Sequence, residues 1–205
     1  MNKIDFRKKY KNFYNASKEP EFVDIPAMNF LMIDGVGDPN TSIDYQNAVE
    51  VLFSVSYTIK FIIKKTAMAI DYGVLPLEGL WWMDDMTQFN QANKKLWKWT
   101  AMIMQPEFVT KETVDKAIKE VEKKKGLPAL NKLSFEKFKE GRSAQVMHIG
   151  PYAAEEPTIK KLHEYIKSNG FKFSGEKQKH HEIYLSDPRK SAPEKMKTIL
   201  RQPII

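Results

Sequence analysis

Apolar residues in the first half of the chain fall into short runs separated by one long amphipathic segment. The run at residues 29–34 stops at the Gly- and Pro-containing stretch 35–40, which is typical of a buried strand that ends in a turn. Between residues 49 and 63 apolar side chains recur at steps of three and four, which indicates a helix with one buried face. In chain order, this half predicts a strand at 29–34, a helix from Thr41 or Ser42 to Lys65, strands at 77–83 and 96–105, and a helix at 110–125.

The second half begins where Gly126-Leu127-Pro128 breaks the helical pattern. A further helix is stopped by Asn169-Gly170, a common C-terminal signal. In chain order, this half predicts a helix at 133–140, a strand at 144–149, a helix at 155–168, a hairpin of 171–174 with 180–185, and a helical turn from Pro193.

The two halves resemble each other in the order of their elements. The best local match sets residues 103–106 against 185–188, with Glu112 opposite Glu194. The sequence therefore predicts an α+β fold of two pseudo-symmetric strand-helix-strand-strand modules with antiparallel sheets and a ligand groove between them. We expect one domain over residues 1–205, made of an N-terminal arm (1–22), a first module (23–125) and a second module (126–205).

Composition narrows the class of protein. The 205 residues are 42% hydrophobic and 29% charged, as in folded globular chains, and they include no cysteine, which excludes disulfides and thiol catalysis. The arm lacks the apolar stretch of a signal peptide, and polar residues interrupt segment 49–63, so we expect no membrane span. These features predict a soluble, cytoplasmic protein and leave its oligomeric state open.

The net charge of +7 raises the question of nucleic-acid binding. The basic residues are mostly dispersed lysines, without helix-turn-helix or finger spacing, so we expect a solvated lysine surface and no specific nucleic-acid binding. No metal site is expected, because His148, His163, His180 and His181 lack ligand spacing. No cofactor is expected either, because Gly35-Val36-Gly37 lacks the third glycine of a nucleotide fingerprint.

Four segments, in order and on matching elements, resemble the GyrI-like family, whose fold is shared with drug-binding domains of multidrug-responsive transcription regulators. They are FLMIDGVGDP (30–39), LEGLWW (77–82), HIGPY (148–152), and EIYLSDP (182–188) followed by PEK (193–195). The resemblance implies tandem modules with a ligand groove and a role in binding diverse small molecules. It also implies that Glu182 corresponds to the buried glutamate that meets cationic ligands. One branch of the family hydrolyses cyclopropane-bearing DNA-alkylating natural products in an aromatic cage, and this chain is similar to that branch in its LEGLWW segment.

Strand alternation groups the candidate residues at 180–185. Glu182 and Tyr184 share one face, and Ile183 and Leu185 share the other. We expect the apolar pair to face the helices, which turns Glu182 and Tyr184 toward the groove. A partly buried carboxylate without a partner indicates a cation site. The alternative is a structural Glu182 that bonds a lysine or a backbone amide, in exchange with His180 or His181.

The same alternation places Glu78 and Trp82 on one face of the strand at 77–83, so that a charge lies beside a large ring. The alternative is that Trp82 belongs to the core or covers a hydrophobic edge. We interpret Trp97 and Trp99 as core.

Two tyrosines complete the set of candidates. Tyr152 follows a strand-to-helix turn from which its ring can reach the groove, and the alternative is local packing at that turn. Tyr57, at the edge of the apolar stripe of the long helix, is a further candidate ligand contact.

Several functions remain open for this groove. A binding module would sequester or sense flat cationic or electrophilic xenobiotics. An enzyme would use Glu182 or Glu78 as a general base for water, with aromatic rings stabilising the positive charge that develops as a strained ring opens. A gyrase-inhibitor-like partner-binding protein is a third class, which the lysine-rich surface disfavours because a DNA mimic should be acidic.

Overall fold

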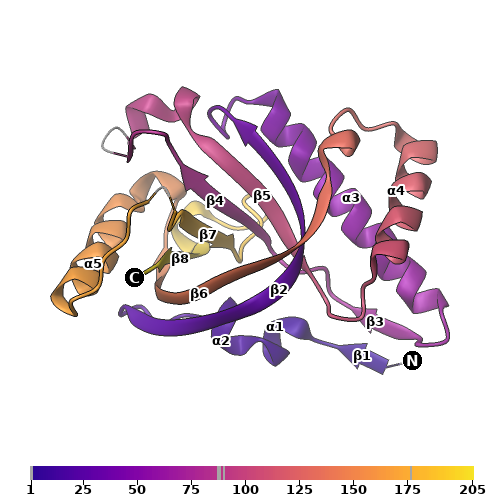
Figure 1. Cartoon of the computed structure of the whole chain (residues 1–205), viewed down its shortest axis with the longest axis horizontal. Helices are drawn as coiled ribbons and strands as arrows, with labels where there is room; N and C mark the ends of the chain where they lie inside the picture. The colour runs from indigo at the N-terminus through magenta and orange to yellow at the C-terminus, as the bar shows by residue number, and fades with distance from the viewer. Residues whose placement is uncertain (1, 87–88, 90, 176) are drawn as a thin grey trace.

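The computed structural model describes residues 2–86, 89, 91–175 and 177–205. Its elements, with η denoting short 3-10 helices, are β1 (Asn2–Ile4), α1 (Phe6–Lys9), α2 (Lys11–Tyr14), β2 (Glu21–Val36), α3 (Ile43–Lys65), β3 (Ile70–Tyr72), β4 (Leu77–Trp82), η2 (Gln91–Leu96), β5 (Lys98–Gln105), α4 (Lys111–Lys125), η3 (Leu130–Lys132), β6 (Ser134–Ile149), η4 (Tyr152–Ala154), α5 (Glu156–Ser168), β7 (His180–Tyr184), η5 (Pro193–Lys195) and β8 (Lys197–Pro203). Figure 1 shows their arrangement.

The helices α3 and α4 begin at residues whose side chains cap them. The Ser42 hydroxyl accepts a hydrogen bond from the main-chain N–H of Tyr45, and the Thr110 hydroxyl accepts one from Thr113. Helix α4 ends at Gly126, whose φ of 57° is left-handed and therefore suits glycine. These contacts confirm the two helices predicted in the first half.

Six strands form a closed barrel in the order β2-β5-β4-β7-β8-β6, with β6 pairing back onto β2. All six pairings are antiparallel. Strands β2 and β6, of 16 residues each, are long enough to pair with each other and also with a strand of their own half. Closure gives every barrel strand two neighbours, so the barrel has no free edge.

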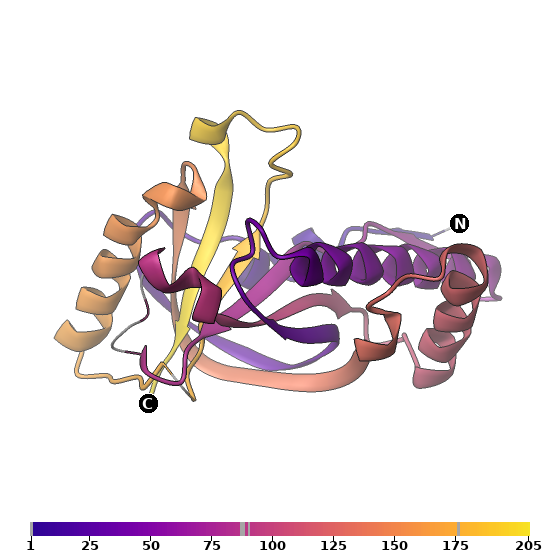
Figure 2. The same ribbon diagram turned by 90° about the horizontal axis from the view of Figure 1, so that it is seen from above.

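Each half of the chain supplies the same series of elements. The first half gives β2-α3-β4-β5 and the second gives β6-α5-β7-β8, and the halves meet where β4 pairs with β7 and β2 with β6. Figure 2 shows α5 and α3 on either side of β8. The predicted α+β fold of two pseudo-symmetric strand-helix-strand-strand modules is confirmed.

Three expectations for the second half are wrong. Residues 133–140 form no helix, because their spaced phenylalanines lie in β6 and pack beside β2. Residues 171–174 form no strand, and the partner of β7 is β8, which the sequence pattern did not predict. Strand β8 is therefore the counterpart of β5, and the alignment of 103–106 with 185–188 is wrong.

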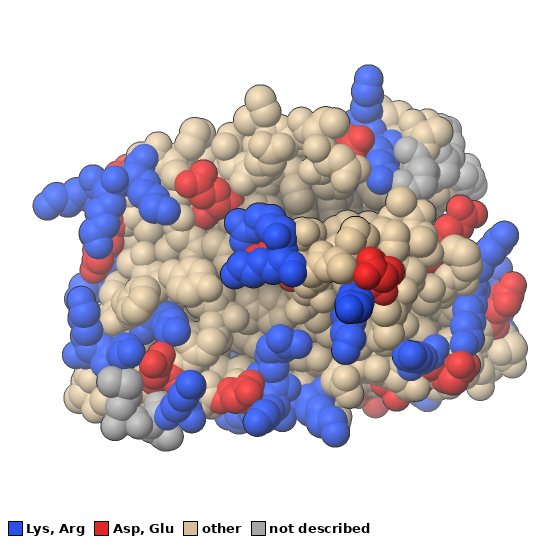
Figure 3. Space-filling view, turned by 180° about the vertical axis from the view of Figure 1, so that it is seen from behind, with Lys and Arg blue, Asp and Glu red and all other residues tan. Residues whose placement is uncertain are grey.

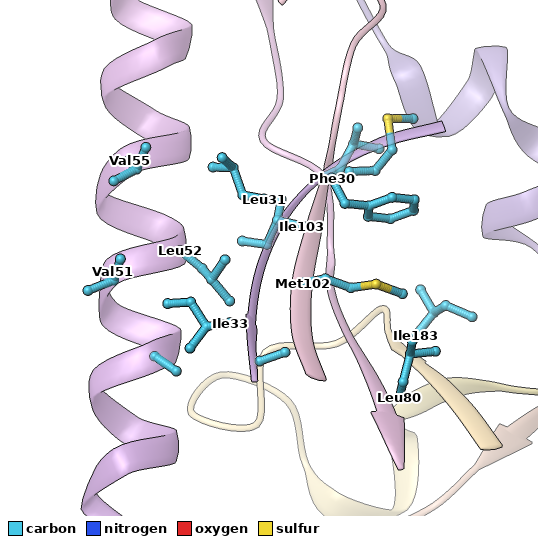
Figure 4. Close-up of a cluster of buried hydrophobic side chains, with 14 of the residues drawn as sticks. Phe30, Leu31, Ile33, Val51, Leu52, Val55, Leu80, Met102, Ile103 and Ile183 are labelled. Carbon is cyan, nitrogen blue, oxygen red and sulfur yellow. The ribbon is translucent and has the colours of Figure 1, made fainter. Parts of the chain in front are cut away.

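Apolar side chains cover both faces of the barrel wall. Figure 4 shows Leu31, Ile33 and Ile103 on the outer face, pointing toward Val51 and Leu52 of α3, and all five are buried. The inner face carries another buried set, which includes Phe30, Leu80, Met102 and Ile183.

Helix α5 covers a different part of the outer face. Leu162 and Ile166 form a second buried cluster with Val146 of β6 and Leu200 of β8. Because α3 contacts β2 and β5 and α5 contacts β6, the middle pair of strands, β4 and β7, lies between the two helices (Figure 1). The outer face of that pair carries the candidate site.

The N-terminal arm packs against the barrel rather than extending into solvent. Strand β1 pairs in parallel with β3, and Phe6 and Tyr14 are buried. The guanidinium of Arg201 donates to the carbonyl of Phe13 (2.6 Å), and the side-chain amide of Gln145 donates to a carbonyl of the same segment.

Charged side chains are spread over the surface that Figure 3 shows, with lysines and arginines scattered and carboxylates between them. Within the described ranges, no helix combines the length and the apolar character that crossing a membrane requires.

Candidate functional site

The register of β7 places Glu182 on the outer face of the barrel wall. Glu182 pairs with Gly79 of β4 and with Leu200 of β8, and directly paired residues point to the same side of a sheet. By alternation, Trp81 and Tyr184 lie on this face as well.

The prediction that Glu182 and Tyr184 share a face is confirmed, but the side given to their neighbours is wrong. Ile183 is paired with Glu78 and points into the barrel, away from the helices (Figure 4). The reason is that a closed barrel has an apolar interior of its own, which strand alternation in a single sheet did not anticipate.

Polar contacts fix the Glu182 carboxylate. The Tyr184 hydroxyl donates to Glu182 Oε2 (2.8 Å) and accepts from Trp81 Nε1 (3.1 Å). His180 Nε2 lies 3.4 Å from Glu182 Oε1, and no lysine or arginine of the described chain forms an ion pair with this carboxylate. The Glu182 side chain is 13% exposed, so the carboxylate is largely buried yet accessible from outside.

Aromatic rings surround this carboxylate. The Tyr152 ring meets the Tyr184 ring edge-on, with centroids 5.5 Å apart, and Tyr45, at the start of α3, packs 5.7 Å from Trp81. Burial, with the charges of nearby glutamates, raises the pKa of Tyr152 to about 12 and that of Tyr184 well above its usual value. Both phenols therefore stay protonated and can act as hydrogen-bond donors.

Gly79 makes room for this arrangement. A Cβ atom at this position would lie 2.7 Å from Trp81 Nε1, closer than non-bonded atoms approach. The indole that holds Tyr184 thus occupies the space that a side chain at position 79 would need.

A second carboxyl group, Glu155, belongs to the same site. It precedes the first residue of α5, is 5% exposed, and its Oε1 has no hydrogen-bond partner. Burial, and next the negative charge of Glu182, raise the pKa of Glu155 to about 9, although Thr198 and Lys94 oppose the shift. Near neutral pH Glu155 therefore carries a proton.

Sequence reasoning missed Glu155. Its only signal is the pair Glu155-Glu156 at a helix start, where acidic residues are common because they complement the helix dipole. Tyr45, which the helical pattern also left unmarked, reaches the site because α3 begins beside the indole of Trp81.

Glu78 lies on the other face of the wall, inside the barrel, and is not brought together with Glu182. The Tyr14 hydroxyl donates to Glu78 Oε1 (2.6 Å), and His181 Nε2 lies 3.0 Å from Glu78 Oε2. His181 Nδ1 is also 2.9 Å from Glu140, which Arg201 contacts in turn (3.1 Å).

Opposite charges balance in this interior network. Burial lowers the pKa of His181, but Glu140 and Glu78 outweigh it and raise that pKa to about 9. Burial likewise raises the pKa of Glu140, but His181 and Arg201 lower it to about 2. The network therefore joins two cations to carboxylates in the barrel interior.

The remaining two candidates also lie apart from Glu182. Trp82 shares the inward face of β4 with Glu78, as predicted, and Lys179 Nζ lies 3.4 Å from its ring centroid. Tyr57 is 48% exposed on α3, beside Phe53. Trp97 and Trp99 are buried in the core, as interpreted from the sequence.

The structure thus brings together Glu182, Tyr184 and Tyr152 of the predicted residues and adds Glu155, Tyr45 and Trp81. In the part of the chain that the structure describes, no three His, Cys, Asp or Glu side chains are grouped so as to hold a metal ion.

Comparisons with known proteins agree with this architecture. The model of the family described as GyrI-like small molecule binding domain matches residues 18–204. An uncharacterized conserved protein from Listeria innocua is 42% identical over 98% of this chain and 100% of its own, with a TM-score of 0.91. A hydrolase from Listeria innocua is 41% identical over 98% and 100% of the two chains, with a TM-score of 0.85.

A more distant structure shares the fold. The C-terminal domain of EcmrR is 12% identical over 91% of this chain and 97% of its own, with a TM-score of 0.55. No curated protein matches the chain.

Proposed function

Because the chain belongs to the GyrI-like small molecule binding domain family, we propose that its site binds flat cationic or electrophilic xenobiotics and hydrolyses a strained ring in them. The binding part of this proposal is supported by the family match, which covers residues 18–204. The hydrolytic part rests on one arrangement, two largely buried carboxyl groups, Glu155 and Glu182, that lie close enough to interact electrostatically among aromatic side chains.

The site offers a flat ligand both rings and charge. Tyr152 and Tyr184 present ring surface beside Glu182, whose carboxylate lacks a lysine or arginine partner among the described residues. A cation held over an aromatic ring gains about 0.5–2 kcal/mol, more where water is excluded. A ligand that carries positive charge, or develops it during reaction, is therefore favoured over an anion.

A carboxyl group that keeps its proton suits the role of the acid in acid–base chemistry, and a neighbouring carboxyl group can serve as the base. Here Glu155 holds the proton, and Glu182, fixed by Tyr184, accepts one. The role of general base that sequence reasoning gave to Glu182 or Glu78 goes to Glu182, because Glu78 is on the other side of the wall.

The proposed substrate is a cyclopropane fused to a conjugated carbonyl, the reactive group of certain DNA-alkylating compounds. Glu182 accepts a proton from water as the water oxygen bonds to a ring carbon. The carbon–carbon bond to that atom breaks, and its electron pair moves into the conjugated system. Glu155 gives its proton to the carbonyl oxygen, which leaves an alcohol and a hydroxyl on the product. Proton transfer from Glu182 back to Glu155 through solvent restores the site.

Sequence and fold similarity to a hydrolase from Listeria innocua supports this proposal. The Listeria innocua hydrolase is 41% identical over nearly the whole length of both chains, so the two proteins share the full fold rather than a fragment.

Product formation tests the proposal. The protein is incubated with a cyclopropane-bearing alkylator, and the ring-opened, water-added product is followed by mass spectrometry. Glu182→Gln and Glu155→Gln should each lower turnover by about 10²–10⁴-fold. Glu156→Gln is the matched control, because this exposed neighbour lies outside the site and should leave turnover unchanged.

The alternative of a sequestering protein predicts a different result with the same reagents. Stoichiometric binding that Glu182→Gln weakens, without product, would reject hydrolysis and retain the binding site. No binding and no product would reject both.

A further inference from the structure

A cavity borders the inner face of β4, the face opposite Glu182, and extends along β6 and the segment before β7. It has a volume of about 470 Å³ and borders Leu80 and Phe138. Leu80 points into the barrel, whereas the next residue, Trp81, points to the outer face. The two sites are therefore separated by the thickness of the barrel wall.

Basic side chains dominate the charge of this cavity. Four of them line it, from β6 and from the segment before β7: Lys139, Arg142, Lys177 and Lys179. Among the described residues none of the four is in an ion pair, whereas several other lysines, such as Lys64, Lys98 and Lys161, are paired with carboxylates.

Two of the four cations contact aromatic rings. Lys179 Nζ lies 3.4 Å from the centroid of Trp82, and Arg142 lies 4.7 Å from that of Phe171. Burial lowers the pKa of Lys179, while the charge of Asp34 raises it. A partly desolvated ammonium group such as that of Lys179 gains from an anionic partner.

The carboxylates near the cavity do not neutralise these cations. Glu140 borders the cavity, but its two oxygens already contact His181 and Arg201. Ile205 also borders the cavity and carries no charged side chain. An excess of positive charge remains beside an apolar wall.

We propose that this cavity binds an amphipathic organic anion. Its carboxylate, sulfonate or phosphate group contacts Lys139, Lys177 and Lys179, and its apolar body packs against Leu80 and Phe138. The protein then has two small-molecule sites of opposite charge preference on the two faces of one wall, and the second does not depend on the function proposed for the first.

The test uses 8-anilinonaphthalene-1-sulfonate, a fluorescent probe with one sulfonate on an aromatic body. Fluorescence titration of the full chain should give saturable binding, with energy transfer from tryptophan that falls in Trp82→Phe. The triple variant Lys139→Gln, Lys177→Gln, Lys179→Gln should bind the probe about tenfold or more weakly. The control triple variant Lys119→Gln, Lys123→Gln, Lys160→Gln removes the same charge from exposed helix positions and should bind as the wild type does.

Competitors define the ligand class. Octanoate should displace the probe, whereas octanol, which lacks the charge, and inorganic phosphate, which lacks the apolar body, should not. Equal affinity in the two triple variants, or displacement by octanol as effective as by octanoate, would overturn the proposal. Glu182→Gln should leave probe binding unchanged, and a loss there would place the probe in the first site and also overturn it.

Discussion

Tyr184 connects Glu182 to Trp81 through a single hydroxyl, which donates to the carboxylate and accepts from the indole. The carboxylate belongs to β7 and the indole to β4, so this chain of hydrogen bonds crosses the seam between the two halves of the molecule. The proposed base is thus held by Tyr184 of its own strand, and Tyr184 is in turn held by Trp81 of the other half.

Tyr184→Phe tests that orientation. The variant keeps the ring beside Tyr152 but removes both hydrogen bonds, which leaves a buried donor on Trp81 without an acceptor. We expect a loss of about 1–3 kcal/mol in unfolding free energy and weaker binding of planar cationic dyes. Urea unfolding and dye titration measure the two effects.

The control for that experiment is Tyr57→Phe, which removes an exposed hydroxyl on α3. It should change neither stability nor dye affinity. A lower dye affinity in Tyr57→Phe would mean that Tyr57 belongs to the binding site after all.

Gly79→Ala should displace the Trp81 indole, because the added Cβ would lie 2.7 Å from its Nε1. We expect lower stability and, through the loss of the contact to Tyr184, weaker dye binding. Gly73→Ala is a matched control, since a Cβ there meets nothing within 4 Å. Wild-type dye affinity in Gly79→Ala would show that the indole does not position the site.

The protonation of Glu155 predicts a pH dependence of stability. The usual carboxyl pKa of 4.5 applies in the unfolded chain, whereas burial and Glu182 raise the pKa to about 9 in the folded one. The stability contributed by this proton is complete below pH 4.5 and is lost as pH rises toward 9. The melting temperature of Glu155→Gln, relative to the wild type, should therefore increase across this interval.

Glu156→Gln serves as the control in the same melting series and should follow the wild type. Turnover should also decline as pH rises through the pKa of Glu155, about 9, because the acid then loses its proton. Constant turnover well above that pH would argue against Glu155 as the proton donor.

The interior network is expected to support stability rather than turnover. Glu140→Gln removes the charge that both His181 and Arg201 contact, and breaking a buried ion pair typically costs about 3–5 kcal/mol. Glu78→Gln should lower stability as well, yet leave dye binding at Glu182 close to that of the wild type. Urea unfolding at neutral pH and dye titration separate the two effects.

Glu120→Gln is the matched control, since it breaks only an exposed ion pair with Lys124 and should change stability by less than about 1 kcal/mol. Loss of dye binding in a folded Glu78→Gln variant would place Glu78 in the binding site.

The sequence allowed the first half of the fold to be predicted well because its helices carry local signals. Ser42 and Thr110 are caps, Gly126 is a terminator, and the apolar spacing of α3 matches its buried face. The second half depends on pairing between distant segments. Residues 134–139 pair with β2 across more than a hundred residues, and no local pattern encodes that partner.

The candidate site shows the same division. The family resemblance and strand alternation identified Glu182 and Tyr184, because both residues lie on one short strand. Glu155 was missed because its role depends on burial beside a residue of another element. Glu78 and Trp82 were correctly placed on one face of β4, but that face turned out to be the interior of a barrel whose closure the sequence did not indicate.

Because side chains alternate along β7, adjacent residues lie on opposite faces of the barrel wall. His181 faces the interior network and Glu182 faces the outer site, so a single inserted or deleted residue in β7 would exchange them. The carboxylate would then point into the barrel and the imidazole would replace it outside. Length changes in this strand should therefore be tolerated far less than substitutions, and natural variation in the length of this part of the chain should be confined to the loops on either side.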